Sequence, residues 1–340
     1  MVTGVIGFYL LTIPSPMIVA LVHGIWGVTT NMTFWPALMK TLRSLGSKNE
    51  QSKVFGFFEG GRGGVNAVYL AAAVGVFGYF TLKGGSILGI KVLIGAYSAI
   101  AIVLGLLLTF LLKGMNESQE SGNDVKLSDI GKVMKYPAAW LMILIVFCTY
   151  FINMSFYYVG PYVTQAFGAS AVFAVILSTA SQYIRPFTAI GAGILGDRIN
   201  SSKVIVIAQF LSLASIVLLL LVPGEAKLMP LIILSVVLMY VAMYATQSMH
   251  FAIMEETDFP KETVGTVIGM ICCIGYLPES ICPYLAGRLF DAFPGATGYR
   301  YYFLIMGVVT VIGLLVVLYW MSKTTEKRRM LQASKNKIKE

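Results

Sequence analysis

Three charged side chains lie inside long apolar runs of this 340-residue sequence, where an unpaired charge is costly. Glu59 and Arg62 are three positions apart, so they share one face of a helix. Arg185 lies in a separate apolar run. Counting the helical rise from the polar end of each run places Arg62 roughly 13 Å deep and Arg185 roughly 15 Å deep. The three side chains are therefore predicted to meet at one depth.

Two interpretations of this predicted cluster remain open. In the first, the arginines bind an anionic ligand, because a guanidinium can hold a carboxylate or phosphate with two parallel hydrogen bonds. In the second, Glu59 neutralises the arginines and ties their helices together, as an ion-pair network does. Two positive charges against one negative charge leave one positive charge for a ligand, which favours the first interpretation.

Other polar residues also fall within apolar runs. Glu279 could carry a coupling proton, and a permanently protonated, hydrogen-bonded carboxyl group is the alternative. Uncharged candidates for substrate contact are Asn31, Asn153, Tyr157, Gln182 and Tyr244. Hydrogen bonding between helices is the alternative for each of them. The four cysteines lack metal-ligand spacing and no Walker motif is present, so we expect no metal, no cofactor and no ATP-driven chemistry.

The elements that carry these residues must be membrane helices. Hydrophobic residues make up 57% of the chain and charged residues 12%, about half the charged share of soluble proteins. An all-α, polytopic helical bundle is the predicted fold class. Its first segment, residues 1–13, is too short to cross the bilayer. Nine runs are long enough to span it: 17–42, 54–80, 87–112, 137–159, 169–195, 204–222, 228–252, 264–289 and 301–321.

The distribution of basic residues predicts the orientation in the membrane. Eighteen of the 25 lysines and arginines fall in alternate gaps between runs, including seven in the tail from Lys323 to Lys339. Cytoplasmic loops carry this excess, so the C-terminus is predicted to be cytoplasmic. The net charge of +9 therefore indicates topology and lipid contact, and we expect no nucleic-acid partner. The predicted divisions are a helical bundle over 1–112, a linker over 113–135, a six-helix bundle over 136–321 and a basic tail over 322–340.

A weak internal repeat relates the two bundles. Residues 47–56 align with residues 260–269 at an offset of 213. Repeats of this kind mark transporters built from two related halves. The same offset leaves about two and a half helices of the second half without a counterpart in the first. A start further upstream would explain this deficit, and a genuine fragment is the alternative.

One cytoplasmic turn carries a recognisable motif. Gly193, Asp197 and Arg198 form a G-x-x-x-D-R sequence, followed by Lys203. The motif resembles the gating loop of the major facilitator superfamily, in the copy that belongs to the second half of the fold. The resemblance implies a two-bundle transporter in which the aspartate caps a neighbouring helix and pairs with arginine, closing the cytoplasmic gate. It implies that these three residues act in gating.

A second segment is similar to uncharacterised bacterial permeases of that superfamily, which are distantly related to organophosphate and organic-anion carriers. It runs from Phe55 to Gly64 and contains Glu59 and Arg62. The resemblance places the helices of Asn31, Asn153 and Tyr244 around a central cavity. It also implies a monomeric secondary transporter of the bacterial cytoplasmic membrane, moving a small, anionic organic solute with an exchanged or coupled ion. A non-transporting receptor or inactive fragment is the alternative. A membrane-embedded enzyme is disfavoured, because the two histidines do not cluster with other catalytic residue types.

Overall fold

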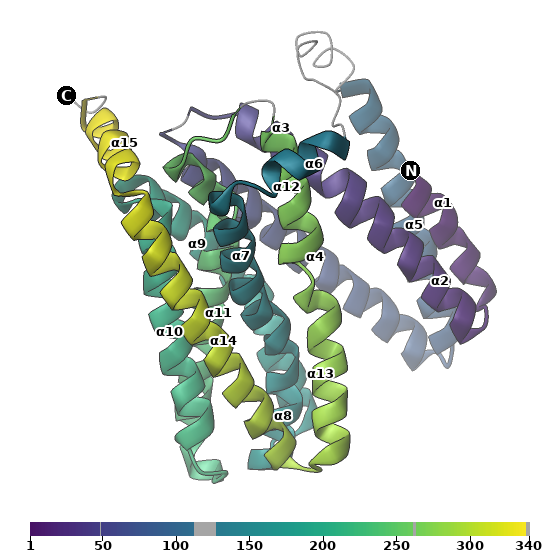
Figure 1. Ribbon diagram of the computed structural model, residues 1–340. Helices are drawn as coiled ribbons and strands as arrows, with labels where there is room; N and C mark the ends of the chain where they lie inside the picture. Colours follow the sequence, from purple (N-terminus) through teal and green to yellow (C-terminus); the bar gives the residue numbers. More distant parts are fainter. Residues whose placement is uncertain (48, 112–126, 261–262, 338–340) are drawn as a thin grey trace. The chain divides into compact units, whose positions relative to one another are not determined.

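The computed structural model describes residues 1–47, 49–111, 127–260 and 263–337, apart from the side chains of residues 31, 32, 86, 127–129, 171 and 335–337. Within these ranges the chain forms helices and connecting turns, without a strand (Figure 1). The α-helices are α1 (Val2–Tyr9), α2 (Pro16–Gly27), α3 (Trp35–Ser44), α4 (Gln51–Leu82), α5 (Ser86–Leu111), α6 (Leu127–Val133), α7 (Pro137–Ser155), α8 (Val159–Phe167), α9 (Ala171–Ile199), α10 (Ser201–Leu221), α11 (Met229–Met249), α12 (Val264–Met270), α13 (Pro278–Ala292), α14 (Ala296–Lys323) and α15 (Thr325–Lys337). The predicted all-α, polytopic fold class is confirmed.

Local sequence signals set several helix ends. Proline begins α2, α7 and α13, where the missing N–H would have no helical partner in any case. Ser170 caps α9, because its hydroxyl accepts the Phe173 amide hydrogen at 3.1 Å. Gly168 ends α8 in the left-handed conformation, which favours glycine.

The predicted spans correspond to long helical segments. In the described part of the chain, eight segments are long and apolar enough to cross a membrane. The predicted span 169–195 corresponds to α9, which has 29 residues but is not among these eight. It carries Gln182, Arg185, Asp197 and Arg198, so its mean hydropathy is lowered by the residues that the sequence singled out.

Two predicted spans are interrupted by π-helical turns. Residues Val28–Phe34 and Ile271–Gly275 take this rare form, which commonly occurs at functional sites. The second interruption changes the position of Glu279. The sequence predicts one continuous span over 264–289 with Glu279 inside it, whereas in the structure Glu279 lies in the first turn of α13.

Two compact units are present, and the first comprises residues 1–38 and 66–126. In its described part, α1 packs closely on α5. A Cβ added to Gly4 would lie 2.5 Å from the Ser98 carbonyl oxygen, so only glycine allows this approach. The Trp26 indole donates a hydrogen bond to the Thr3 carbonyl at 3.0 Å, which joins α2 to α1.

The second unit comprises residues 39–65 and 127–340, and it contains the larger core. Its helices α7, α10, α11 and α14 run side by side (Figure 1). Polar side chains link these helices inside the apolar core. The Ser215 and Ser235 hydroxyls lie 3.0 Å apart between α10 and α11, and each donates to the other residue's carbonyl. Such bonds supply specific attachment where every helix face is apolar.

Candidate functional site

The three charged residues of the predicted cluster lie together in the second unit. A carboxylate oxygen of Glu59, Oε2, is 2.5 Å from Arg185 Nη2, and its other oxygen is 3.4 Å from Arg62 Nη1. The exposed side-chain fraction is 6% for Glu59, 9% for Arg185 and 33% for Arg62. One carboxylate therefore contacts two guanidinium groups, one buried and one partly accessible. We call these three residues the charged cluster.

Aromatic side chains surround the charged cluster. The guanidinium carbon of Arg185 lies 5.2 Å from the ring centre of Tyr244, a cation–π distance. Tyr150 and Tyr276 interact electrostatically with Arg62, and their rings are 4.5 Å apart. Tyr157 interacts electrostatically with both Arg185 and Glu279. Four phenols, from α7, the turn that follows it, α11 and the turn before α13, thus border the two arginines.

The other predicted substrate-contact residues differ from one another in burial and in location. Asn153 is buried on α7, and its amide nitrogen has no hydrogen-bond partner among the described residues. Gln182 is half-buried on α9, three residues before Arg185. Tyr157 is exposed. Asn31 lies in the first unit, and its side chain is outside the described part of the structure.

Helices α4 and α9 approach each other through small residues. We call this contact the α4–α9 seam: Ser52, Gly56, Gly60 and Gly63 on α4, and residues 185–186, 189–190, 193 and 196–197 on α9. A Cβ added to Gly56 would lie 2.7 Å from both the Ala189 carbonyl oxygen and the Gly193 Cα. The contacts move backward along α9 as they advance along α4, so the helices are antiparallel. Small residues at four-residue spacing let the two backbones touch.

The predicted gating residues lie at one end of the α4–α9 seam. The Asp197 carboxylate accepts the backbone N–H groups of Ser52 at 3.1 Å and Lys53 at 3.2 Å. These amides are among the first of α4, where no helical carbonyl is available to them. Gly193 is buried, and an added Cβ would lie 2.6 Å from the Ser52 carbonyl oxygen. Arg198 is exposed. The geometry of a helix-capping aspartate is therefore present in this chain.

Sequence reasoning missed one ion pair and one buried acid near the same end. Arg43 on α3 pairs with Glu255, and its other nitrogen lies 3.0 Å from Met254 Sδ. Glu256 is buried and accepts hydrogen bonds from the Ser202 amide at 2.8 Å and the Trp320 indole at 3.0 Å. The signal that could have found them was two adjacent acids directly after a long apolar run.

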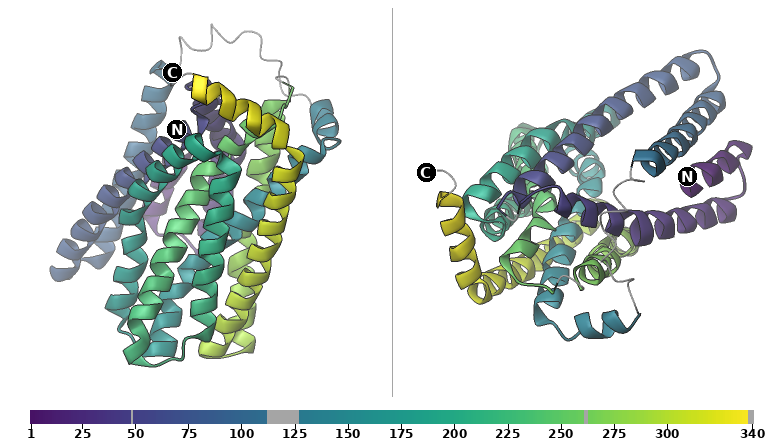
Figure 2. Two further views of the ribbon diagram at one scale, coloured as in Figure 1. Left: turned by 90° about the vertical axis from the view of Figure 1, so that its left-hand side faces the viewer. Right: turned by 90° about the horizontal axis from the view of Figure 1, so that it is seen from above.

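The C-terminal helix α15 attaches to these segments. It turns away from α14 after Thr324, as the left view of Figure 2 shows. Gln332 donates to the Arg198 carbonyl at 2.8 Å, Lys327 pairs with Asp258 at 2.5 Å, and Arg328 Nε lies 3.9 Å from Glu256. Part of the basic tail is thus folded against the turns that carry the gating residues.

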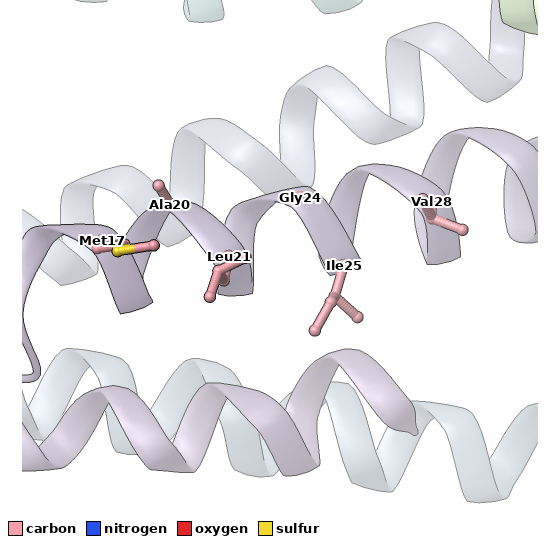
Figure 3. A pocket seen from close by; sticks show the side chains of 6 residues that line it. All are labelled: Met17, Ala20, Leu21, Gly24, Ile25 and Val28. Atoms are coloured by element: carbon pink, nitrogen blue, oxygen red, sulfur yellow. The ribbon is translucent and has the colours of Figure 1, made fainter.

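Among the described residues, no group of three or more histidine, cysteine, aspartate or glutamate side chains is placed to hold a metal ion. A shallow groove of about 520 Å³ runs along α2 in the first unit (Figure 3). Its lining is apolar throughout: Met17, Ala20, Leu21, Gly24, Ile25 and Val28. This groove offers no polar group to a charged ligand.

Comparisons with known proteins place these features in a family. The Inner membrane protein YihN of Escherichia coli (strain K12) is 29% identical over 343 residues, covering 98% of this chain and 80% of that protein. The Inner membrane protein YqcE of the same organism is 28% identical over 328 residues, covering 93% of this chain and 75% of that protein.

Solved structures agree at the level of the fold. A bacterial homologue of the iron transporter ferroportin in the outward-facing state superimposes with a TM-score of 0.64 at 13% identity, covering 90% of this chain and 71% of that one. A structure of a bacterial homologue of ferroportin in the outward-facing state with soaked iron gives a TM-score of 0.60 at 13% identity. The family model of the Major Facilitator Superfamily matches residues 1–278 and, in a second match, residues 142–339. The chain therefore belongs to the major facilitator superfamily, a family of multi-pass, non-enzymatic membrane transporters.

Proposed function

We propose that this protein is a secondary active transporter that moves a small organic anion across the membrane by alternating access. The observation that carries this proposal is the convergence of Arg62 and Arg185 on the single carboxylate of Glu59. Two buried or partly buried guanidinium groups that share one carboxylate can accept a further negative charge from a ligand. The neighbouring phenols of Tyr150, Tyr157 and Tyr244 can donate hydrogen bonds to oxygen atoms on the same ligand.

The chemistry of guanidinium defines the ligand class. A carboxylate, phosphate or sulfonate group presents two oxygen atoms that match the paired N–H donors of arginine. Lysine carries the same charge but cannot reproduce this planar, bidentate arrangement. We therefore expect the anionic group, and not the rest of the solute, to select the substrate at this site.

The proposal also covers the driving force of transport, the further substrate contacts and the orientation in the membrane. Transport is driven by an ion gradient or by exchange, with Glu279 as the candidate proton carrier, because it interacts electrostatically with Tyr150 and Tyr157 beside the charged cluster. Asn153 and Gln182 are candidate substrate contacts, and Asn31 is the candidate from the first unit. The protein acts as a monomer in the bacterial cytoplasmic membrane, with its C-terminus in the cytoplasm.

Reconstitution into proteoliposomes tests the proposal. Uptake of radiolabelled gluconate, glycerol phosphate and isethionate covers a carboxylate, a phosphate and a sulfonate, each with a hydroxylated body. Arg62→Lys and Arg185→Lys should each reduce anion uptake about tenfold, equivalent to about 1.4 kcal/mol, because lysine retains the charge but cannot form the bidentate contact. Lys83→Arg, a conservative exchange at an exposed position, is the matched control.

Two results would contradict the proposal. If both lysine variants transport every anion that the wild-type protein transports, and at the wild-type rate, the charged cluster is structural and the substrate site lies elsewhere. If the wild-type protein binds an anion without translocating it, a non-transporting receptor replaces the transporter. Neutral polyols of the same size should not be transported, and their uptake would also exclude an anion site.

A further inference from the structure

Glu59 occupies the position that an anionic ligand would be expected to take. Its carboxylate lies between the two guanidinium groups, with one oxygen toward Arg185 and the other toward Arg62. The carboxylate is buried, so water competes little for these contacts. A ligand carboxylate that bound both arginines would need the same oxygen positions.

Arg185 retains a donor that Glu59 does not use. Arg185 Nε is buried and has no hydrogen-bond partner among the described residues, although the same guanidinium contacts Glu59 and Tyr244. An unsatisfied buried donor is costly and is commonly found at functional positions. Arg62 contacts Glu59 at the longer distance of 3.4 Å and keeps a third of its side chain exposed. An anion could therefore approach from the Arg62 side and reach Arg185.

The Glu59–Arg185 pair also holds two helices together. Glu59 lies on α4 and Arg185 on α9, and both border the α4–α9 seam near Gly60 and Gly63. The Asp197 cap on Ser52 and Lys53 lies at the opposite end of the same seam. Between these two polar attachments, the seam residues are mostly glycine and other small residues.

We infer that Glu59 is an internal competitor for the anion site: it binds both arginines in the ligand-free protein, and an incoming anion displaces it from Arg185. This inference rests on the proposed anion transport. Displacement removes one of the two polar attachments of the α4–α9 seam, so ligand binding weakens the contact between these helices. The apparent affinity for the anion is lowered by the fraction of molecules in which Glu59 occupies the arginines.

Anion binding to the purified protein in detergent tests this inference, with gluconate, glycerol phosphate and isethionate as probes. Glu59→Gln removes the competing charge at nearly constant shape, so the dissociation constant for the transported probe should fall. If Glu59 holds the arginines in nine of ten molecules, the expected fall is about tenfold. Glu50→Gln removes an acid from an exposed position just before α4 and should leave the dissociation constant unchanged.

A second variant keeps the test valid if Glu59→Gln does not fold, since that substitution leaves Arg185 without its carboxylate partner. Glu59→Asp keeps the charge but is one methylene shorter, so it cannot contact both arginines at their present distances. It should bind the probe more tightly than wild type, by a smaller factor than Glu59→Gln. In the double variants with Arg185→Lys, both gains should disappear.

The outcomes separate this inference from the proposed function. If Arg62→Lys and Arg185→Lys weaken probe binding while neither Glu59 variant strengthens it, the anion site stands and the competitor inference is wrong. If the lysine variants bind as wild type does, or if no variant binds any probe, both are wrong. A tighter Glu59→Gln variant that loses its gain with Arg185→Lys supports both.

Discussion

At the scale of single residues, the protein uses buried acids in two different settings. Glu59 is balanced by two arginines, whereas Glu256 lies outside the membrane spans and accepts the Ser202 amide and Trp320 indole hydrogens. Removing one partner of a buried ion pair typically costs about 3–5 kcal/mol, because the other charge is left uncompensated. The Glu59–Arg185 pair is therefore expected to contribute to folding as well as to ligand binding.

Glu256 gives a prediction about pH. Burial raises its pKa above the ordinary value, and the hydrogen bonds from Ser202 and Trp320 offset only part of this effect. A carboxyl group whose pKa is higher in the folded than in the unfolded state stabilises the fold most below its unfolded-state pKa. That contribution is lost as the pH rises through the raised folded-state value. Each tenfold difference in proton affinity between the two states corresponds to about 1.4 kcal/mol.

Thermal unfolding in detergent between pH 4 and 8 checks this expectation. The stability of wild type relative to Glu256→Gln should decrease as the pH rises, because glutamine does not titrate. Glu225→Gln, at an exposed loop acid, is the matched control. A stability difference that stays constant across the whole range would show that the pKa of Glu256 is not raised.

At the scale of elements, the α4–α9 seam explains why glycine recurs in both helices. Gly56, Gly60 and Gly193 lie where an added Cβ would meet backbone or side-chain atoms at 2.6 to 2.7 Å. Glycine in a helix interior costs roughly 1 kcal/mol relative to alanine. The sequence carries this cost at the seam because no larger residue allows the two backbones to approach.

Gly56→Ala should destabilise the protein by about 1–3 kcal/mol, since the added methyl group meets the backbone of Ala189 and Gly193, which cannot rotate away. Gly61→Ala is the matched control on the same helix, because nothing lies within 4 Å of its Cβ position. That control should be neutral or slightly stabilising. Thermal unfolding of the two variants provides the measurement, and equal melting temperatures would show that the seam does not limit packing.

Asp197→Asn tests the other attachment of the seam. Asparagine can still accept one backbone hydrogen bond, but it loses the charge that interacts with the positive end of α4. Conformational cycling should therefore be impaired more than ligand binding. Uptake into proteoliposomes and probe binding in detergent are measured separately on the same preparation. An equal loss of both would place Asp197 in the ligand site instead.

At the scale of the whole molecule, the helices and the meeting of Glu59, Arg62 and Arg185 were predictable, whereas many other side-chain contacts were not. Rise per residue is fixed in a helix, so distance along the sequence gave a common depth for Arg62 and Arg185. Rotation about the axis is not fixed when a helix is apolar all round. For that reason the contacts of Tyr150 and Tyr276 could not be predicted. Pro278 marks the break before α13, but proline is also tolerated inside membrane helices, so its presence did not predict that the helix is interrupted there.

The orientation of the chain in the membrane is also a property of the whole molecule. The seven basic residues of the tail predict that the C-terminus lies in the cytoplasm. A green fluorescent protein fused after Glu340 should therefore fluoresce, and alkaline phosphatase fused at the same position should be inactive in cells. The opposite pair of results would invert the predicted orientation of every span.

The α4–α9 seam also determines how its two helices can move. Interdigitated side chains resist translation along a helix axis, because each must change rotamer to pass its neighbours. Gly56 and Gly193 present only backbone to each other, so this part of the seam resists sliding little, and polar attachments hold it at Asp197 and at Glu59–Arg185. The seam therefore favours axial shear over hinge bending. How far α4 and α9 can slide past each other is therefore controlled by the two polar attachments, at Asp197 and at Glu59–Arg185.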